Sequence, residues 1–126
     1  MDVKDKVKSF EDACKVLDIT PSVTVVTGIP EKYQKPLIAN YQLMVIAEAL
    51  NEGWTPDWSN REWDKFFPWF DMDDSSSAGR FSFDAAVNRL SYSSVGSRLC
   101  FKSEELADYA GTQFLDIYKD FFTVKQ

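Results

Sequence analysis

The feature that most constrains the fold is the segment from residue 31 to 52, EKYQKPLIANYQLMVIAEALNE. Its apolar side chains recur at helical spacing and cover more than half the circumference of a helix: Leu37, Ile38, Tyr41, Leu43, Met44, Val45, Ile46, Ala47, Ala49 and Leu50. A helix that is apolar over so much of its surface must be covered on several sides. The segment therefore predicts a central helix, with Pro36 in its first turn or at a kink and Gly53 just after its end.

Two other helices are expected to flank the central one. Ser9 and Asp12 form a capping-box pattern, and the apolar stripe that follows places Cys14 in the core as a buried thiol. This helix is predicted to end at Thr20-Pro21. Ser103 precedes two glutamates and a second apolar stripe, which predicts one C-terminal helix reaching about residue 121.

The stretch from about residue 63 to 102 has the alternation of a small antiparallel sheet. FSFDAAV predicts a half-buried strand, and SRLCFKS predicts another, with Arg98, Cys100 and Lys102 facing outward. SVTVVTGIP, residues 22–30, is either a strand or an extended linker. The predicted fold class is α+β: N-terminal helices, a small antiparallel β-sheet, and a C-terminal helix packed on a central helix, in a single domain spanning 1–126.

Charge and residue content narrow the classes of function. The net charge of −6 disfavours direct nucleic-acid binding and anionic membrane surfaces. The chain has no histidine and only two cysteines, which argues against zinc and against a Ser-His or Cys-His nucleophile. No cofactor is expected. No signal peptide or membrane span is recognisable, and a reduced, cytoplasmic location is expected.

All four tryptophans lie between residues 54 and 69, among carboxylates. We expect Trp54 and Trp69 to pack on the central helix. Trp58 and Trp63, flanked by residues such as Asp57 and Asp64, are expected to be partly exposed. Exposed aromatic rings in an acidic surrounding are typical of a protein-binding or self-association surface.

Charge is also segregated along the chain. From residue 54 to 74, six carboxylates against Arg61 and Lys65 leave a balance of −4. From residue 75 to 102, three arginines and one lysine against one aspartate leave +3, and the arginines are Arg80, Arg89 and Arg98. The two segments are expected either to pair within the sheet or to form complementary patches for a partner or a second copy.

A calcium site is only weakly indicated. Asp71 and Asp73, with Asp74 beside them, resemble the start of a calcium-binding loop, but Ser76 and Ser82 stand where such a loop needs a glycine and a glutamate. We therefore expect no bound metal.

Two enzymatic alternatives remain open. Glu62, Asp64 and Asp71 lie among tryptophans and would serve as a carboxylate pair if folding brought two of them together. Cys100 lies between two cations and just before a helix start, both of which lower the pKa of a thiol, so it is a candidate reactive thiol.

Three phrases carry a resemblance: ALNEGWTPDWSN, PWFDMD and VGSRLCFKSEELADYAGTQFLDIYKDF. They resemble small uncharacterised proteins of gut Bacteroidales and their phages, including crAss-like phages, over most of the chain from about residue 9 to 122. The resemblance implies a source but no activity.

The sequence thus favours a non-catalytic, protein-binding accessory protein of phage or mobile-element origin that uses an acidic aromatic patch. The first alternative is a small enzyme that uses carboxylates or Cys100. The second is a structural subunit of a larger assembly such as a virion. A protein partner is expected, and self-association is left open.

Overall fold

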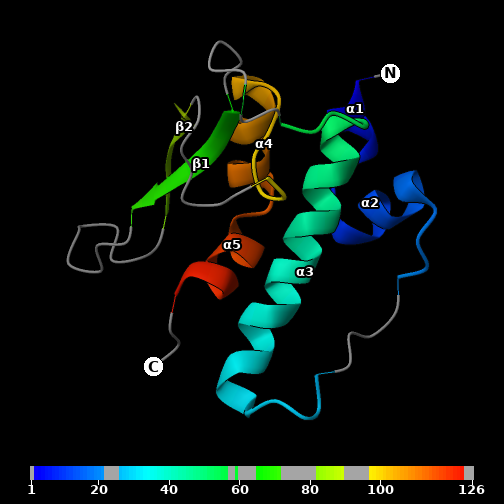
Figure 1. Ribbon diagram of the computed structural model, residues 1–126, viewed down its shortest axis with the longest axis vertical. Coiled ribbons are helices and arrows are strands. Elements are labelled where there is room, and N and C mark those ends of the chain that lie inside the picture. The colour runs from blue at the N-terminus through cyan, green and yellow to red at the C-terminus, as the bar shows by residue number, and fades with distance from the viewer. Residues whose placement is uncertain are drawn as a thin grey trace.

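The computed structural model describes residues 2–21, 26–56, 59, 65–71, 82–89 and 97–123, and for residues 69, 71 and 82–89 it describes the backbone only. The described part is mainly helical, and its longest helix, α3, lies between α2 on one side and α5 on the other (Figure 1). In chain order the elements are α1 (Val3–Lys6), α2 (Phe10–Leu17), α3 (Glu31–Asn51), β1 (Lys65–Asp71), β2 (Ser82–Arg89), α4 (Glu104–Gln113) and α5 (Leu115–Phe122). None of the described helices combines the length and the apolar character that crossing a membrane requires.

The start of α2 confirms the capping pattern. The Ser9 hydroxyl accepts a hydrogen bond from the Asp12 N–H at 3.1 Å, and the Asp12 carboxylate accepts one from the Lys8 N–H at 3.0 Å. The helix ends at Leu17, before the predicted Thr20-Pro21, because Asp18 adopts the left-handed conformation with φ 57°. A short polar side chain tolerates that conformation better than most residues do.

The predicted coverage on several sides holds for the C-terminal half of α3 only. Leu43, Ile46 and Leu50 are almost completely buried, whereas Tyr33 and Leu37 are 50% and 41% exposed. The core position predicted for Leu37 is therefore wrong. The reason is orientation: α5 reaches Lys35, whose ammonium lies 3.6 Å from the Asp120 carboxylate, but it does not cover the side of α3 that carries Tyr33 and Leu37.

The predicted C-terminal helix is divided in two. Ser103 caps α4 as expected, with its hydroxyl accepting from the Leu106 N–H at 3.2 Å. At Phe114 the backbone leaves helical geometry, with φ −111° and ψ 30°, and α5 begins at Leu115. The prediction of one helix was wrong, but the predicted packing of the C-terminal segment on the central helix is confirmed for α5. A buried Phe114 allows α4 to pack on the strands while α5 packs on α3.

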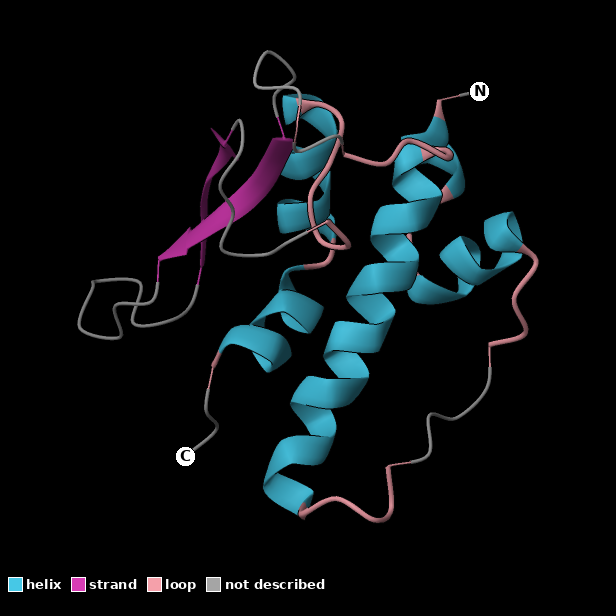
Figure 2. Cartoon of the chain, in the orientation of Figure 1, coloured by secondary structure: helices cyan, strands magenta, loops and turns pink. Residues whose placement is uncertain are grey.

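The described strands form one antiparallel pair against α4 (Figure 2). Lys65 lies opposite Arg89 and Asp71 opposite Ser82, with an irregularity between Trp69 and Phe70. The wider sheet predicted from 63 to 102 is not seen as a whole in the described residues.

The predicted strand SRLCFKS is wrong for its described part. Residues 97–102 form a turn and a single bridge, in which the Phe66 N–H donates to the Phe101 carbonyl at 3.0 Å and the Phe101 N–H donates back at 2.7 Å. The side-chain amide of Asn51 binds the backbone on either side of Phe101. It therefore ties this segment to the end of α3.

The hydrophobic core is one cluster to which every described helix contributes. Val3 and Val7 bring the N-terminal segment into this cluster, and Leu99 and Phe101 bring in the loop before α4. The strands contribute Phe66 and Phe70 at its border. The packed helices therefore fix the positions of the surface side chains that they carry.

Candidate protein-binding surface

Four aromatic side chains gather where β1 meets α5, and we call them the α5 aromatic surface: Phe70, Tyr118, Phe121 and Phe122. The Phe70 ring lies 4.9 Å from the Tyr118 ring and 5.6 Å from the Phe122 ring, measured between centroids. Phe121 and Phe122 meet edge to face at 5.0 Å. Ring pairs at these separations attract one another beyond their burial of apolar area.

The cluster is buried at one end and exposed at the other. Tyr118 is almost completely buried, and burial raises its pKa above the ordinary value of a tyrosine. Phe122 leaves 37% of its surface exposed, although it contacts three other rings. An exposed ring held in place by packed neighbours loses little conformational freedom when it binds a partner.

Most of the tryptophan segment lies outside the described residues. Trp58, Trp63, Asp57, Asp64 and Arg80 fall there, so their predicted roles stay predictions. Trp54 is half-buried just after α3, with its backbone N–H donating to the Asn51 carbonyl at 3.0 Å. The segment leads directly into β1, which carries Phe70 of the α5 aromatic surface.

The other predicted binding residues lie apart along the chain. The backbone of Arg89 pairs with that of Lys65 at the start of β1, and its side chain is not described. Arg98 is exposed in the turn before Cys100.

Of the weak calcium candidates, Asp73 and Asp74 lie outside the described residues, and only the backbone of Asp71 is described. Within the residues whose placement is described, no three potential metal ligands come together.

The predicted environment of Cys100 was wrong. The side chain is fully buried, and burial raises its pKa to about 11. Its thiol donates a weak hydrogen bond to the Ser97 carbonyl at 3.6 Å. The cation that acts on the thiol is the buried Lys65, which lowers the pKa by less than burial raises it. The alternating pattern of residues 97–102 predicted an outward-facing thiol, but alternation gives the side of a residue only in a strand, and this segment is a turn and a bridge. Cys14, by contrast, is buried as predicted.

Sequence reasoning also missed Asn51. This buried side chain donates from Nδ2 to the Cys100 carbonyl at 2.9 Å and accepts at Oδ1 from the Lys102 N–H at 3.0 Å. It thereby ties the end of α3 to the loop before α4. The one signal in the sequence was a polar residue at the end of an apolar helix, which does not indicate its partners.

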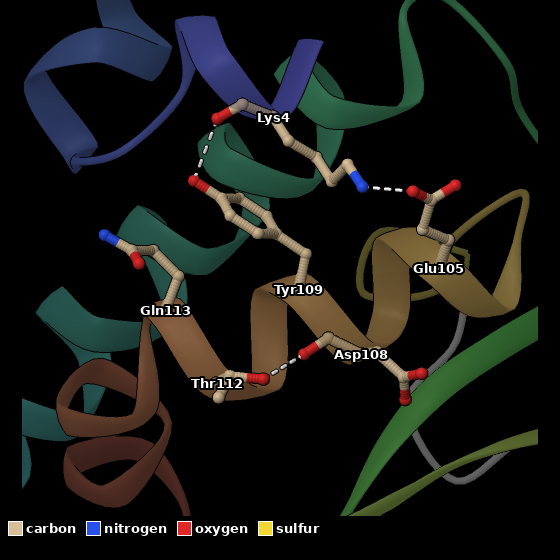
Figure 3. Close-up of a pocket in the computed structure, with 6 residues that line it drawn as sticks. All are labelled: Lys4, Glu105, Asp108, Tyr109, Thr112 and Gln113. Atoms are coloured by element: carbon tan, nitrogen blue, oxygen red, sulfur yellow. Dashed lines mark hydrogen bonds and ion pairs between the residues drawn. The ribbon is translucent and has the colours of Figure 1, made fainter. Parts of the chain in front are cut away.

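A shallow hollow of about 380 Å³ lies beside α4, where Lys4 of α1 reaches it (Figure 3). The Tyr109 hydroxyl lies 2.6 Å from the Val7 carbonyl and 3.0 Å from the Lys4 carbonyl. Lys4 pairs with Glu105, and Gln113 donates to the Lys8 carbonyl at 2.9 Å. These polar groups attach the N-terminal segment to α4. We therefore interpret the hollow as a place where two segments of the chain pack together.

Comparison of the chain with known protein families, with curated proteins and with solved structures gives no match. The resemblance to Bacteroidales and phage proteins therefore stays a prediction, and a functional interpretation rests on the surfaces of the molecule itself.

Proposed function

We propose that the protein is a non-catalytic binding protein whose partner is another protein. The observation that carries the proposal is Phe122, which is 37% exposed and held by the rings of Phe70, Tyr118 and Phe121. Large aromatic side chains in well-packed surroundings dominate the energy of many protein interfaces. The α5 aromatic surface has this composition and this rigidity.

The tryptophan segment is proposed to extend the same surface. It joins β1 within a few residues of Phe70, and Trp58 and Trp63 would add rings while Asp57 and Asp64 would add the acidic surrounding. The arginines Arg80, Arg89 and Arg98 would set charge complementarity with the partner. A small antiparallel sheet wider than the β1–β2 pair belongs to this proposal. The proposal also includes an origin in a phage or mobile element. It includes a reduced, cytoplasmic location as well, and the two free, buried cysteines support that location.

The chemistry of the described residues favours binding over catalysis. Cys100 is buried with a raised pKa, which is the opposite of what a thiol nucleophile requires. The polar groups around the hollow beside α4 are engaged in holding α1. A structural role in a larger assembly is a form of the same binding proposal, because it also requires a stable contact with another chain.

The test is retention of partners from the native host by the wild type and by matched variants. Phe122→Ser removes the exposed ring, and Trp58→Ala/Trp63→Ala removes the predicted extension. Val16→Ser is the control, because Val16 is 43% exposed on α2 and lies outside the aromatic cluster. We expect a retained protein to bind Phe122→Ser about tenfold or more weakly, the loss typical of an interface hot spot, and to bind Val16→Ser unchanged. Equal affinity of the retained protein for wild type and Phe122→Ser would reject the proposed surface.

A further inference from the structure

The break between α4 and α5 has no local cause in the sequence. Neither a proline nor a glycine stands at Phe114 or next to it, although sharp interruptions of a helix usually coincide with such residues. One apolar stripe at helical spacing runs through both helices: Ala107, Ala110, Phe114, Ile117 and Phe121. The local sequence therefore favours one continuous helix, and the packing of the folded protein interrupts it.

The break leaves backbone groups of a continuous helix unused. The Phe114 N–H still donates to the Ala110 carbonyl at 3.0 Å. The Ile117 N–H donates to Phe114, three residues before it, at 3.0 Å. In the described part of the chain, neither Leu115 nor Ile117 donates to the carbonyl four residues earlier, as an unbroken helix requires. Straightening the chain at Phe114 would form these bonds, one of them in place of the bond from Ile117 to Phe114.

The two helices are also held by different parts of the molecule. Most contacts of α4 are with the strands, whereas α5 lies against α3 (Figure 1). The Asp120 carboxylate of α5 lies 3.6 Å from the Lys35 ammonium of α3, and the Tyr118 ring lies 4.9 Å from the Phe70 ring of β1. Because α4 contributes little to holding α5, α5 can leave its site while α4 stays in place.

The site that α5 occupies identifies the partner. If the chain straightens at Phe114, the buried Tyr118 ring is exposed, and the side of α3 and β1 that it covered is uncovered. A surface that has just released α5 is complementary to α5 in shape and in charge. The α5 helix of a second copy therefore fits it with the same contacts, which is why exchange of an identical element is a low-cost route to a dimer.

We propose that Phe114 is a hinge at which α5 is exchanged between two copies of this chain. In the exchanged pair, α4 and α5 form one helix, and each α5 occupies the site on α3 and β1 of the other copy. Each α5 aromatic surface then combines Phe70 of one copy with Tyr118, Phe121 and Phe122 of the other. The inference does not depend on the proposed function, because it concerns which copy supplies α5 and not what the surface binds.

The exchange conserves the apolar area that α5 buries, so the dimer does not need a large exposed patch on the monomer. Its gain over the monomer is limited to the backbone bonds formed at the two hinges, and pairing costs freedom of motion. Within one copy, α5 also competes for its own site at a high effective concentration. The dimer is therefore expected only at high protein concentration, and its formation is slow because α5 must first detach.

Sedimentation equilibrium after prolonged incubation at millimolar concentration tests the hinge. The wild type should contain dimer. Asp116 is exposed in the first turn of α5, where a proline is tolerated. In an unbroken helix the same proline would clash with the carbonyl of residue 112, so Asp116→Pro should raise the dimer dissociation constant about tenfold or more. Asp116→Ala is the matched control, because it removes the same carboxylate and keeps the N–H, and it should leave the dimer in place.

Crosslinking of two mixed variants distinguishes exchange from side-by-side pairing. One variant carries Lys35→Cys and the other Asp120→Cys, and the native Cys14 and Cys100 are buried. After joint incubation, a short thiol crosslinker should join one copy of each variant, because α5 of one lies on α3 of the other. A dimer whose mixed copies do not crosslink would overturn the proposal. So would a wild type that stays monomeric, or equal effects of Asp116→Pro and Asp116→Ala.

Discussion

Replacing Asn51 by leucine removes the link between the end of α3 and the loop before α4. Leucine has a similar size, so the change removes two hydrogen bonds without opening a large cavity. The Cys100 carbonyl then loses its 2.9 Å donor and the Lys102 N–H loses its 3.0 Å acceptor. Asn51 is 5% exposed, so water cannot readily replace the amide. A buried group left without its hydrogen bond costs roughly 1–3 kcal/mol, and the Lys102 N–H is only part-buried, so we expect a loss of about 2–4 kcal/mol.

Urea denaturation followed by circular dichroism measures this loss as a lower transition midpoint with an unchanged slope. Gln42→Ala is the control, because Gln42 lies on the same helix, is half-buried and makes no hydrogen bond within the described residues. It should change the free energy of unfolding by no more than about 0.5 kcal/mol. Equal stabilities of Asn51→Leu and the wild type would show that the amide does not join these two segments.

Replacing Asn51 by aspartate keeps the acceptor of one hydrogen bond and makes the donor of the other depend on pH. An ionised carboxylate still accepts from the Lys102 N–H but faces the Cys100 carbonyl oxygen without a proton to donate. Burial and this repulsion should raise the pKa of the new carboxyl above its unfolded value of about 3.9. The stability of the variant relative to the wild type is then greatest below about pH 4 and falls as the pH rises through the folded pKa. Equal stability at pH 4 and pH 7 would contradict this account.

Four further predictions concern the contacts of Cys100, Tyr109 and Ser103. Burial raises the pKa of Cys100 to about 11, so a thiol reagent at pH 8 should label it far more slowly in the native than in the unfolded protein, and equal rates would refute the burial. Through the same linkage, stability should fall as the pH rises from about 8.5 toward 11, which urea titrations at several pH values would measure. Tyr109→Phe removes the hydroxyl from the Val7 carbonyl and should cost about 1 kcal/mol, with faster hydrogen exchange at residues 3–8, and unchanged exchange there would contradict the contact. Ser103→Ala removes the cap of α4 and should cost about 1 kcal/mol in a thermal melt, and an unchanged melting temperature would contradict the cap.

The sequence predicted those parts of the fold that depend on local signals. Ser9 and Ser103 cap helices because their hydroxyls reach backbone N–H groups three residues ahead, which is a property of the nearby chain alone. The burial of Cys14 followed from its place on an amphipathic stripe. The apolar character of residues 31–52 likewise indicated the central helix.

What the sequence failed to predict depends on contacts between distant segments. Leu37 is exposed because it lies on a side of α3 that α5 does not cover, although α5 reaches Lys35 nearby, and no pattern within α3 indicates where its neighbours pack. The break at Phe114 is invisible to periodicity because the apolar stripe continues on both sides of it. Cys100 is buried after the turn at residues 97–99, where its carbonyl accepts from Asn51, a residue distant in sequence.

The candidate surface differs from the predicted one. The predicted patch of Trp58 and Trp63 lies outside the described residues and stays a prediction, whereas the surface formed by Phe70 and three α5 side chains was not indicated by the sequence. The apolar stripe of the C-terminal segment predicted that Phe121 faces the core, with Tyr118 beside the stripe, and only the packing of α5 against β1 brings Phe70 and Phe122 together.

The central claim is that a protein partner binds the α5 aromatic surface. Hydrogen-exchange mass spectrometry of the protein, free and saturated with a partner purified from the host, tests it most directly. The account predicts slower exchange on binding at residues 66–70 and 115–122, and unchanged exchange in α2. Slower exchange confined to α2 or to the hollow beside α4, with residues 115–122 unaffected, would contradict it.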